Sequence, residues 1–267
     1  MPDPLRLLAD APLSLAVADR LHLVETTAPE YAPRLTVAAG RLPRLAPGTV
    51  LTPAAGPSLR IEGAFSRPGE GDIPASRVHV ATVLTPGDLP AGETAFATEK
   101  PGLALAWITL SDKGSQGLRA DTAGPAIATA CAAALPVALA KGHIIPDEPV
   151  MLKALLVDLA LTQGYDLIVT TGGTGLSPRD TTPESTLAVI EKRLPGFETA
   201  MLTASLAKTP HAMLSRAVAG TLGQAIIVNV PGSPKAVRET LAAILPAIPH
   251  GLDKLRGDPS DCAQVLG

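Results

Sequence analysis

The residues with the clearest chemical meaning lie in one glycine-rich stretch, DLIVTTGGTGLSPRDTTPEST, at residues 166–186. An apolar run leads directly into Gly172, Gly173, Thr174 and Gly175, and a helix is expected to open near Pro183. Glycines let backbone N–H groups approach a phosphate closely, and the helix N-terminus adds unpaired N–H groups and a positive dipole end. The stretch therefore predicts an anion cradle, although a plain strand–loop turn would also use glycine.

This cradle is not one of the two most familiar phosphate loops, since neither a Walker A sequence nor GxGxxG is present. Asp180 follows it at the start of the next helix. A carboxylate beside a bound phosphate is unfavourable unless a cation lies between them, and Mg²⁺ prefers one or two carboxylates together with phosphate oxygens and water. Asp180 is thus interpreted either as a Mg²⁺ ligand or as a helix-capping residue.

Three further polar segments follow expected strands. Each could equally be an ordinary turn or a helix cap. Ligands of parallel sheets bind beyond the carboxyl ends of the strands, so we expect Asp147 and Asp180 to converge there. The residues concerned are Ser111 and Asp112 after 103–110, Asp147 and Glu148 after 137–145, and Pro231, Gly232 and Ser233 after 225–230, with Ser215 and Arg216 contributed by AMLSRAVAG.

The elements that must position these residues alternate between strand and helix. Long apolar runs indicate strands buried on both faces, and the expected fold of residues 101–267 is a three-layer α/β domain with a mostly parallel sheet. The expected strands are 103–110, 137–145, 166–171 and 225–230, and the expected helices are 122–135, 149–164, 183–194 and one that opens after the turn at 231–234.

Residues 1–100 have a different pattern. Short β-rich runs are separated by Gly, Pro and Asp, which predicts a smaller all-β domain, either a barrel or a sandwich. Loops are expected at 66–76 and 86–93, and EKPG at 99–102 marks the boundary. No motif assigns this domain a role, and a structural or oligomerisation module is the preferred interpretation.

Composition excludes several classes of protein. Apolar residues make up 46% of the chain but aromatic residues only 2%, and the formal charge is −3, so neither a basic surface nor a stacking platform for nucleic acid is expected. No signal peptide or membrane span is apparent, which predicts a cytoplasmic protein without a membrane partner. Cys131 and Cys262 suggest no disulfide framework, and the histidines show no metal-ligand spacing.

Together these strings resemble the MogA/MoaB family of molybdopterin adenylyltransferases, with the resemblance placed at residues 102–267. The strings are ITLSDKGSQG, IIPDE, the TTGGTG…PRD…TPE block, LAKTPHAMLSRAVAG and IIVNVPGSPKAVRETL. The resemblance implies a homotrimer, ATP and molybdopterin as substrates, Mg²⁺ as the metal, and transfer of AMP to the molybdopterin phosphate with release of pyrophosphate. It also implies hand-over of the product to a MoeA-like metal-insertion protein.

The resemblance further implies roles for individual residues. Asp147 and Asp180 match two functionally critical aspartates and are the expected metal ligands. Where the family commonly has PGFGE, this chain has PGFET at 195–199, which puts that local contact in doubt. Two alternatives remain, a carrier that binds molybdopterin without catalysis and, less favoured, a CinA-like protein. The expected contacts to pterin or nucleotide are Ser111, Asp112, Thr170, Thr171, Gly172, Gly173, Thr174, Gly175, Ser177, Ser215, Pro231, Gly232 and Ser233.

Overall fold

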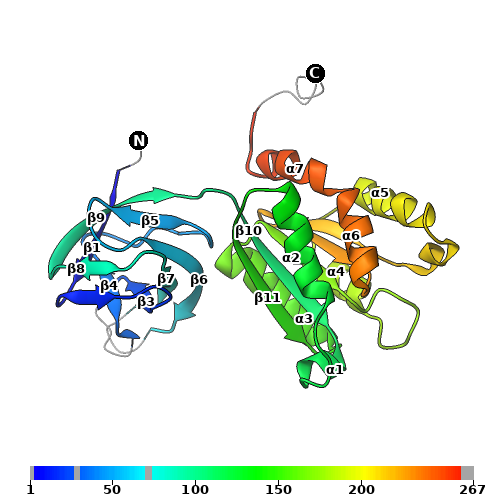
Figure 1. Ribbon diagram of the computed structural model, residues 1–267, viewed down its shortest axis with the longest axis horizontal. Helices are drawn as coiled ribbons and strands as arrows, with labels where there is room; N and C mark the ends of the chain where they lie inside the picture. Colours follow the sequence, from blue (N-terminus) through cyan, green and yellow to red (C-terminus); the bar gives the residue numbers. More distant parts are fainter. Residues whose placement is uncertain (1–2, 27–30, 70–73, 260–267) are drawn as a thin grey trace. The chain divides into compact units, whose positions relative to one another are not determined.

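The computed structural model describes residues 3–26, 31–69 and 74–259. The chain divides into two compact units, Met1–Gly102 and Leu103–Gly267 (Figure 1). Each has its own hydrophobic core. The loop expected at 66–76 lies partly outside the described residues, and Cys262 lies wholly outside them. No helix of the described residues is long and apolar enough to cross a membrane.

The first unit contains a closed barrel with the strand order β1-β4-β3-β7-β6-β5-β9. Buried and exposed positions alternate along its strands, as a barrel with a packed interior requires. The segment expected as a loop at 86–93 instead contains the short strand β8, which pairs with β2 outside the barrel. The strands are β1 Leu5–Ala9, β2 Leu13–Leu15, β3 Arg20–Val24, β4 Arg34–Val37, β5 Val50–Pro53, β6 Leu59–Arg67, β7 Ser76–Val83, β8 Gly87–Leu89 and β9 Gly92–Glu99.

The second unit is built on a six-stranded sheet with the order β11-β10-β12-β15-β14-β13. The first four strands are parallel, and β14 and β13 continue the sheet antiparallel. This is the mostly parallel sheet expected from the apolar runs. Its strands are β10 Leu103–Leu110, β11 Val137–Ile145, β12 Leu167–Thr171, β13 Lys192–Arg193, β14 Ala219–Leu222 and β15 Ala225–Val230.

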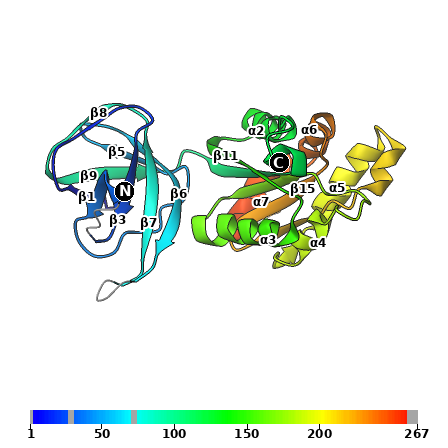
Figure 2. The same ribbon diagram turned by 90° about the horizontal axis from the view of Figure 1, so that it is seen from below.

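Helices cover both faces of this sheet. Leu103 and Leu105 of β10 belong to the core beneath α2, α5, α6 and α7, whereas Ala104 and Ala106 belong to the core beneath α3 and the π-helical turn η2. Figure 2 shows α2 and α6 on one side of the sheet and α3 and α4 on the other. The fold is therefore three-layered. The helices are α1 Asp112–Ser115, α2 Ala123–Ala134, α3 Pro149–Val157, η2 Asp158–Gln163, α4 Thr182–Leu187, α5 Pro195–Leu206, η3 Pro210–Leu214, α6 Pro234–Ala242, η4 Leu245–Ala247 and α7 Ile248–Leu255.

One expected helix was wrong in extent. The helix expected at 183–194 ends at Leu187, and Lys192 and Arg193 form β13, which pairs with Thr221 and Gly220. These basic residues suggested the C-terminus of a helix, but they form the edge strand of the sheet. The helix expected at 149–164 is α3 continued by η2, and Gly164 ends it with a φ of 89°.

Cys131 is fully buried in α2, where burial raises the pKa of its thiol to about 12.

Candidate active site

The site lies where the parallel strands end together. Leu110 of β10 pairs with Ile145 of β11, and Thr171 of β12 pairs with Val230 of β15. Because these strand ends are in register, the polar segments that follow them emerge at one edge of the sheet. The parallel register therefore brings the segments that follow β10, β11, β12 and β15 to the same edge of the sheet.

The glycine-rich loop has a backbone conformation that favours glycine at two positions. Gly172 and Gly173 have φ values of 97° and 63°. A Cβ atom on Gly172 would lie 2.6 Å from the carbonyl oxygen of Leu110, and one on Gly173 would lie 2.3 Å from Oγ1 of Thr182. The Thr182 hydroxyl donates to the carbonyl of Gly172 at 3.0 Å, which ties the loop to the start of α4.

A buried hydrogen-bond network joins the strand that leads into this loop, β12, to β15 and α4. Asn229 of β15 donates from Nδ2 to the hydroxyls of Thr170, at 2.8 Å, and Thr186, at 2.9 Å. All three side chains are fully buried, and the hydroxyl of Thr171 donates to the carbonyl of Pro231 at 2.8 Å. The threonine side chains thus position the loop, and Asn229, which the sequence analysis did not single out, joins β15 to β12 and α4.

Arg216 holds the far side of the loop. Its Nε donates to the carbonyl of Gly175 at 2.8 Å, its Nη2 donates to the carbonyl of Asp180, and its backbone N–H donates to the carbonyl of Thr174 at 3.0 Å. It also forms an ion pair with Glu184. The LSRA string therefore contributes an arginine that fixes the cradle backbone.

Neither of the two expected metal-binding aspartates caps the helix that follows it. The Asp180 carboxylate accepts from the N–H of Ser177 at 2.8 Å, and the Asp180 N–H donates to the carbonyl of Ser177 at 2.8 Å. Thr181, the residue before α4, makes no side-chain cap. Asp147 precedes Glu148, the N-cap position of α3, and its Oδ2 accepts from the N–H of Asp112 at 3.1 Å. The capping interpretation is thus wrong for both.

Two serines of the expected site, Ser111 and Ser233, cap helices. Ser111 accepts from the N–H of Gly114 at 3.0 Å at the start of α1, and Ser233 accepts from the N–H of Ala236 at 3.2 Å at the start of α6. Asp121 accepts from the N–H groups of Ala123 and Gly124 at the start of α2. These hydroxyl and carboxyl groups are therefore engaged in holding the strand-end turns.

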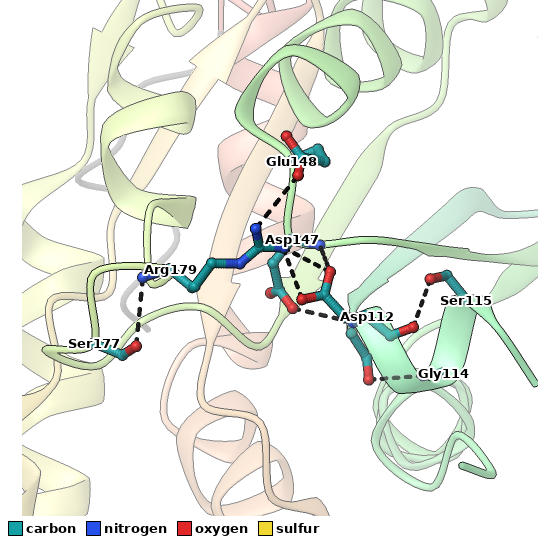
Figure 3. Close-up of polar contacts among 8 residues, drawn as sticks. Asp112, Gly114, Ser115, Asp147, Glu148, Ser177 and Arg179 are labelled. Atoms are coloured by element: carbon teal, nitrogen blue, oxygen red, sulfur yellow. Dashed lines mark hydrogen bonds and ion pairs between the residues drawn. The ribbon is translucent and has the colours of Figure 1, made fainter. Parts of the chain in front are cut away.

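Arg179 links three strand-end loops (Figure 3). Its Nη2 lies 2.7 Å from both carboxylate oxygens of Asp112, and its Nη1 lies 3.5 Å from Oε1 of Glu148. Asp112 Oδ1 also accepts from the N–H of Asp147 at 3.1 Å. Burial and the neighbouring Asp112 and Asp180 raise the pKa of Asp147, against the opposing effects of the Asp112 N–H and Arg179. The cluster is rich in carboxylates relative to its one arginine.

Two cavities are lined by residues of the expected site. Ser111, Thr171, Gly172 and Gly232 line a cavity of about 180 Å³, here called the Ser111 cavity. Ser215, Pro231 and Arg216 line one of about 430 Å³, here called the Ser215 cavity. Ser111, Thr171, Gly172 and Gly232 thus line one cavity, and Ser215 and Pro231 line the other. The remaining expected contact residues line neither cavity: Asp112, Thr170, Gly173, Thr174, Gly175, Ser177 and Ser233. In the described part of the chain, no group of three or more His, Cys, Asp or Glu side chains forms a metal cage.

The altered PGFET segment has a defined structure at the wall of the Ser215 cavity. The carboxylate of Glu198 forms an ion pair with Arg193 at 2.8 Å and accepts from the N–H of Ala219 at 3.2 Å. Glu198 lies in the first turn of α5. The shifted acidic residue is therefore held against β13 and β14.

Comparison with known proteins identifies the class to which this site belongs. Residues 106–250 match the family model described as a probable molybdopterin binding domain. The chain is 40% identical over 152 residues to the molybdopterin adenylyltransferase of Helicobacter pylori strain J99, covering 57% of this chain and 86% of the relative. It is also 40% identical over 161 residues to gephyrin of Dictyostelium discoideum, but spans only 22% of that protein.

A solved structure agrees with these matches. The molybdopterin biosynthesis enzyme MoaB of Thermus thermophilus aligns with a TM-score of 0.54 and 45% identity, covering 60% of this chain and 99% of MoaB. The chain therefore belongs to the molybdopterin-binding domain family. Within it, the similarity to the adenylyltransferases makes the protein an enzyme of molybdenum cofactor biosynthesis. The barrel lies outside the matched residues.

Proposed function

We propose that the second unit transfers AMP from ATP to the phosphate of molybdopterin and releases pyrophosphate in a Mg²⁺-dependent reaction. The observation that carries this proposal is that a glycine-dependent loop, a cavity lined by Thr171 and Gly172, and a carboxylate cluster lie at one sheet edge. A second cavity is lined by Pro231 and by Arg216, which binds the loop. Two polyanionic substrates need two neighbouring binding spaces and a cation site beside them.

The donor set fits Mg²⁺. Asp147 and Asp180 would hold the ion, directly or through water, because oxygen ligands from one or two carboxylates are what Mg²⁺ prefers. The raised pKa of Asp147 means that its surroundings disfavour its negative charge, a situation that a cation would relieve. When bound, Mg²⁺ neutralises charge that develops on the departing pyrophosphate.

The chain's own residues supply position and electrostatics. An oxygen of the molybdopterin phosphate attacks the α-phosphorus of ATP, and the bond from that phosphorus to the β-phosphate oxygen breaks. No protein nucleophile is required, and the attacking phosphate is already ionised at neutral pH. Backbone N–H groups of Gly172–Gly175 hold the transferred phosphate, and the hydrogen bonds of Arg216 to this loop keep the donors in place.

The assembly proposed for this reaction is a homotrimer in the cytoplasm that passes its product to a MoeA-like metal-insertion protein. Exposed apolar side chains support a self-association surface. They occur on β11 and α3, at Ile144, Val150, Met151 and Val157, and on α5 and η3, at Leu202, Leu206, Met213 and Leu214. Figures 1 and 2 both show α3 and α5 apart, so two patches of one copy could meet those of its neighbours in a closed ring.

The test is to incubate the full chain with molybdopterin, ATP and Mg²⁺ and to measure pyrophosphate together with adenylylated molybdopterin by mass spectrometry. Equal amounts of both products, dependent on Mg²⁺ and lost in Asp180→Ala, are expected. Tight molybdopterin binding without pyrophosphate would instead assign the chain to the carrier class.

A further inference from the structure

Arg179 occupies the position of a counter-ion among the site carboxylates. Its guanidinium contacts both oxygens of Asp112 and reaches Glu148, and Asp112 in turn accepts from the N–H of Asp147 (Figure 3). The Arg179 and Asp112 side chains are 55% and 46% exposed, so both can change partners at little cost in buried surface.

The charge balance around Arg179 is uneven. Asp112, Asp147, Glu148 and Asp180 supply four carboxylates, and Arg179 is the cation that contacts Asp112 and Glu148. One guanidinium therefore stabilises a cluster that a divalent ion would stabilise more strongly.

The backbone of Arg179 belongs to the cradle loop. It lies between Ser177 and Asp180, which are joined by two hydrogen bonds, and its own N–H points to Oγ of Ser177 at 3.4 Å. If its side chain releases Asp112, the guanidinium stays tethered beside the glycines that would hold phosphate. Guanidinium groups bind phosphate oxygens in a bidentate manner, as they do carboxylates.

We propose that Arg179 is an exchange residue: it neutralises Asp112 and Glu148 in the metal-free enzyme and moves to the nucleotide phosphates when Mg²⁺ and ATP enter. This inference rests on the metal site of the proposed function and adds to it a specific role for the arginine of the PRD string. If Arg179 acts in this way, removing its guanidinium should strengthen metal binding and weaken nucleotide binding.

The test uses Mn²⁺ as the probe and the full chain without nucleotide, with free Mn²⁺ measured by electron paramagnetic resonance. Arg179→Gln is expected to bind Mn²⁺ about threefold to tenfold more tightly than wild type, because a nearby positive charge is lost from a partly exposed site. The KM for ATP is expected to rise by about tenfold in the same variant. Arg179→Lys should lie between the two proteins in both measurements.

The matched control is Arg6→Gln, which removes an arginine from an exposed ion pair with Glu93 in the barrel and should change neither value. Emission of Trp107 and thermal unfolding check that each variant is folded. Unchanged or weaker Mn²⁺ binding by Arg179→Gln would overturn the exchange, even if product still forms. Tighter Mn²⁺ binding without any adenylylated product from wild type would keep the exchange and overturn the proposed reaction.

Discussion

Asp112 and Asp147, 35 positions apart in the sequence, bind each other's backbone: each carboxylate accepts from the other's N–H at 3.1 Å. This reciprocal pair fixes the loops after β10 and β11 at a constant separation. It also brings two carboxylates together, which is one reason why the pKa of Asp147 is raised after the larger effect of burial. The hydrogen bond from the Asp112 N–H lowers the pKa of Asp147 more than the Asp112 charge raises it, so the cost of ionising Asp147 comes mainly from burial.

Asp147→Asn is the first prediction. A carboxyl group whose pKa is raised in the folded state favours folding below its unfolded pKa and loses that contribution as pH rises through the folded value. At pH 7 the charge on Asp147 therefore destabilises the metal-free protein. An amide still accepts from the Asp112 N–H, so we expect the melting temperature at pH 7 to rise by about 1–2 °C.

The activity of Asp147→Asn should fall although its melting temperature rises. Because Asp147 is a proposed Mg²⁺ ligand, loss of its charge is expected to reduce turnover on the order of a hundredfold or more. Calorimetry without metal, repeated at pH 3.5, gives the control, since the difference between variant and wild type should shrink when Asp147 is protonated. A variant that melts lower at pH 7 but not at pH 3.5 contradicts the prediction.

Gly175→Ala tests the contact between the cradle and Asp180. Unlike Gly172 and Gly173, Gly175 has no positive φ, but its Cβ would lie 2.8 Å from Oδ2 of Asp180. The carboxylate can swing away, so we expect a folded enzyme whose kcat falls about tenfold or more because Asp180 is displaced. Gly196→Ala is the matched control, since nothing lies within 4 Å of its Cβ. Equal kinetics for both variants would refute the steric argument.

Much of this arrangement could be predicted from the sequence. The strands at 103–110, 137–145 and 225–230 were predicted with their observed ends, because apolar runs bounded by turn residues leave little ambiguity in a sheet covered on both faces. The need for glycine in the loop was equally clear, since the two positive φ values fall on glycines of the GGTG string.

The parts that could not be predicted depend on tertiary pairing. The local sequence around Lys192 and Arg193 favours a continued helix. These residues form a strand because they pair with β14, which lies almost 30 positions further along the chain. Asn229 looks like one polar residue in an apolar strand until Thr170 and Thr186 are brought beside it. The bond from Arg179 to Asp112 spans 67 positions and has no local signal.

Thr170→Val tests whether the network beneath the loop stabilises the fold. Asn229 would lose one of its two partners in a fully buried position, which costs about 1–3 kcal/mol. Thr221→Val is a matched control on β14, because the buried Thr221 hydroxyl has no partner among the described residues. Urea unfolding followed by Trp107 emission should show a lower midpoint for Thr170→Val alone. A comparable loss in both variants would mean that the cost arises from repacking the β-branched side chain.

His79 gives the barrel a pH dependence of its own. The side chain is fully buried and bonded through Nε2 to the carbonyl of Pro43 at 3.2 Å, and burial, with Arg77 and Arg44 nearby, lowers its pKa to about 4. A depressed pKa contributes stability above the unfolded value of 6.5, and this contribution is lost as pH falls toward 4. We expect the unfolding equilibrium constant of the barrel to rise roughly tenfold or more between pH 7 and 4.5.

His79→Gln should remove most of this dependence, because an amide can still donate to Pro43 but does not titrate. The only tryptophan, Trp107, lies in the second unit, so far-UV circular dichroism reports both units while tryptophan emission reports the second alone. A circular-dichroism transition that moves to lower urea at pH 4.5 in wild type but not in His79→Gln, with the Trp107 transition alike in both proteins, is the expected result. If the two proteins lose stability in parallel on acidification, the pH dependence belongs to other groups in the barrel.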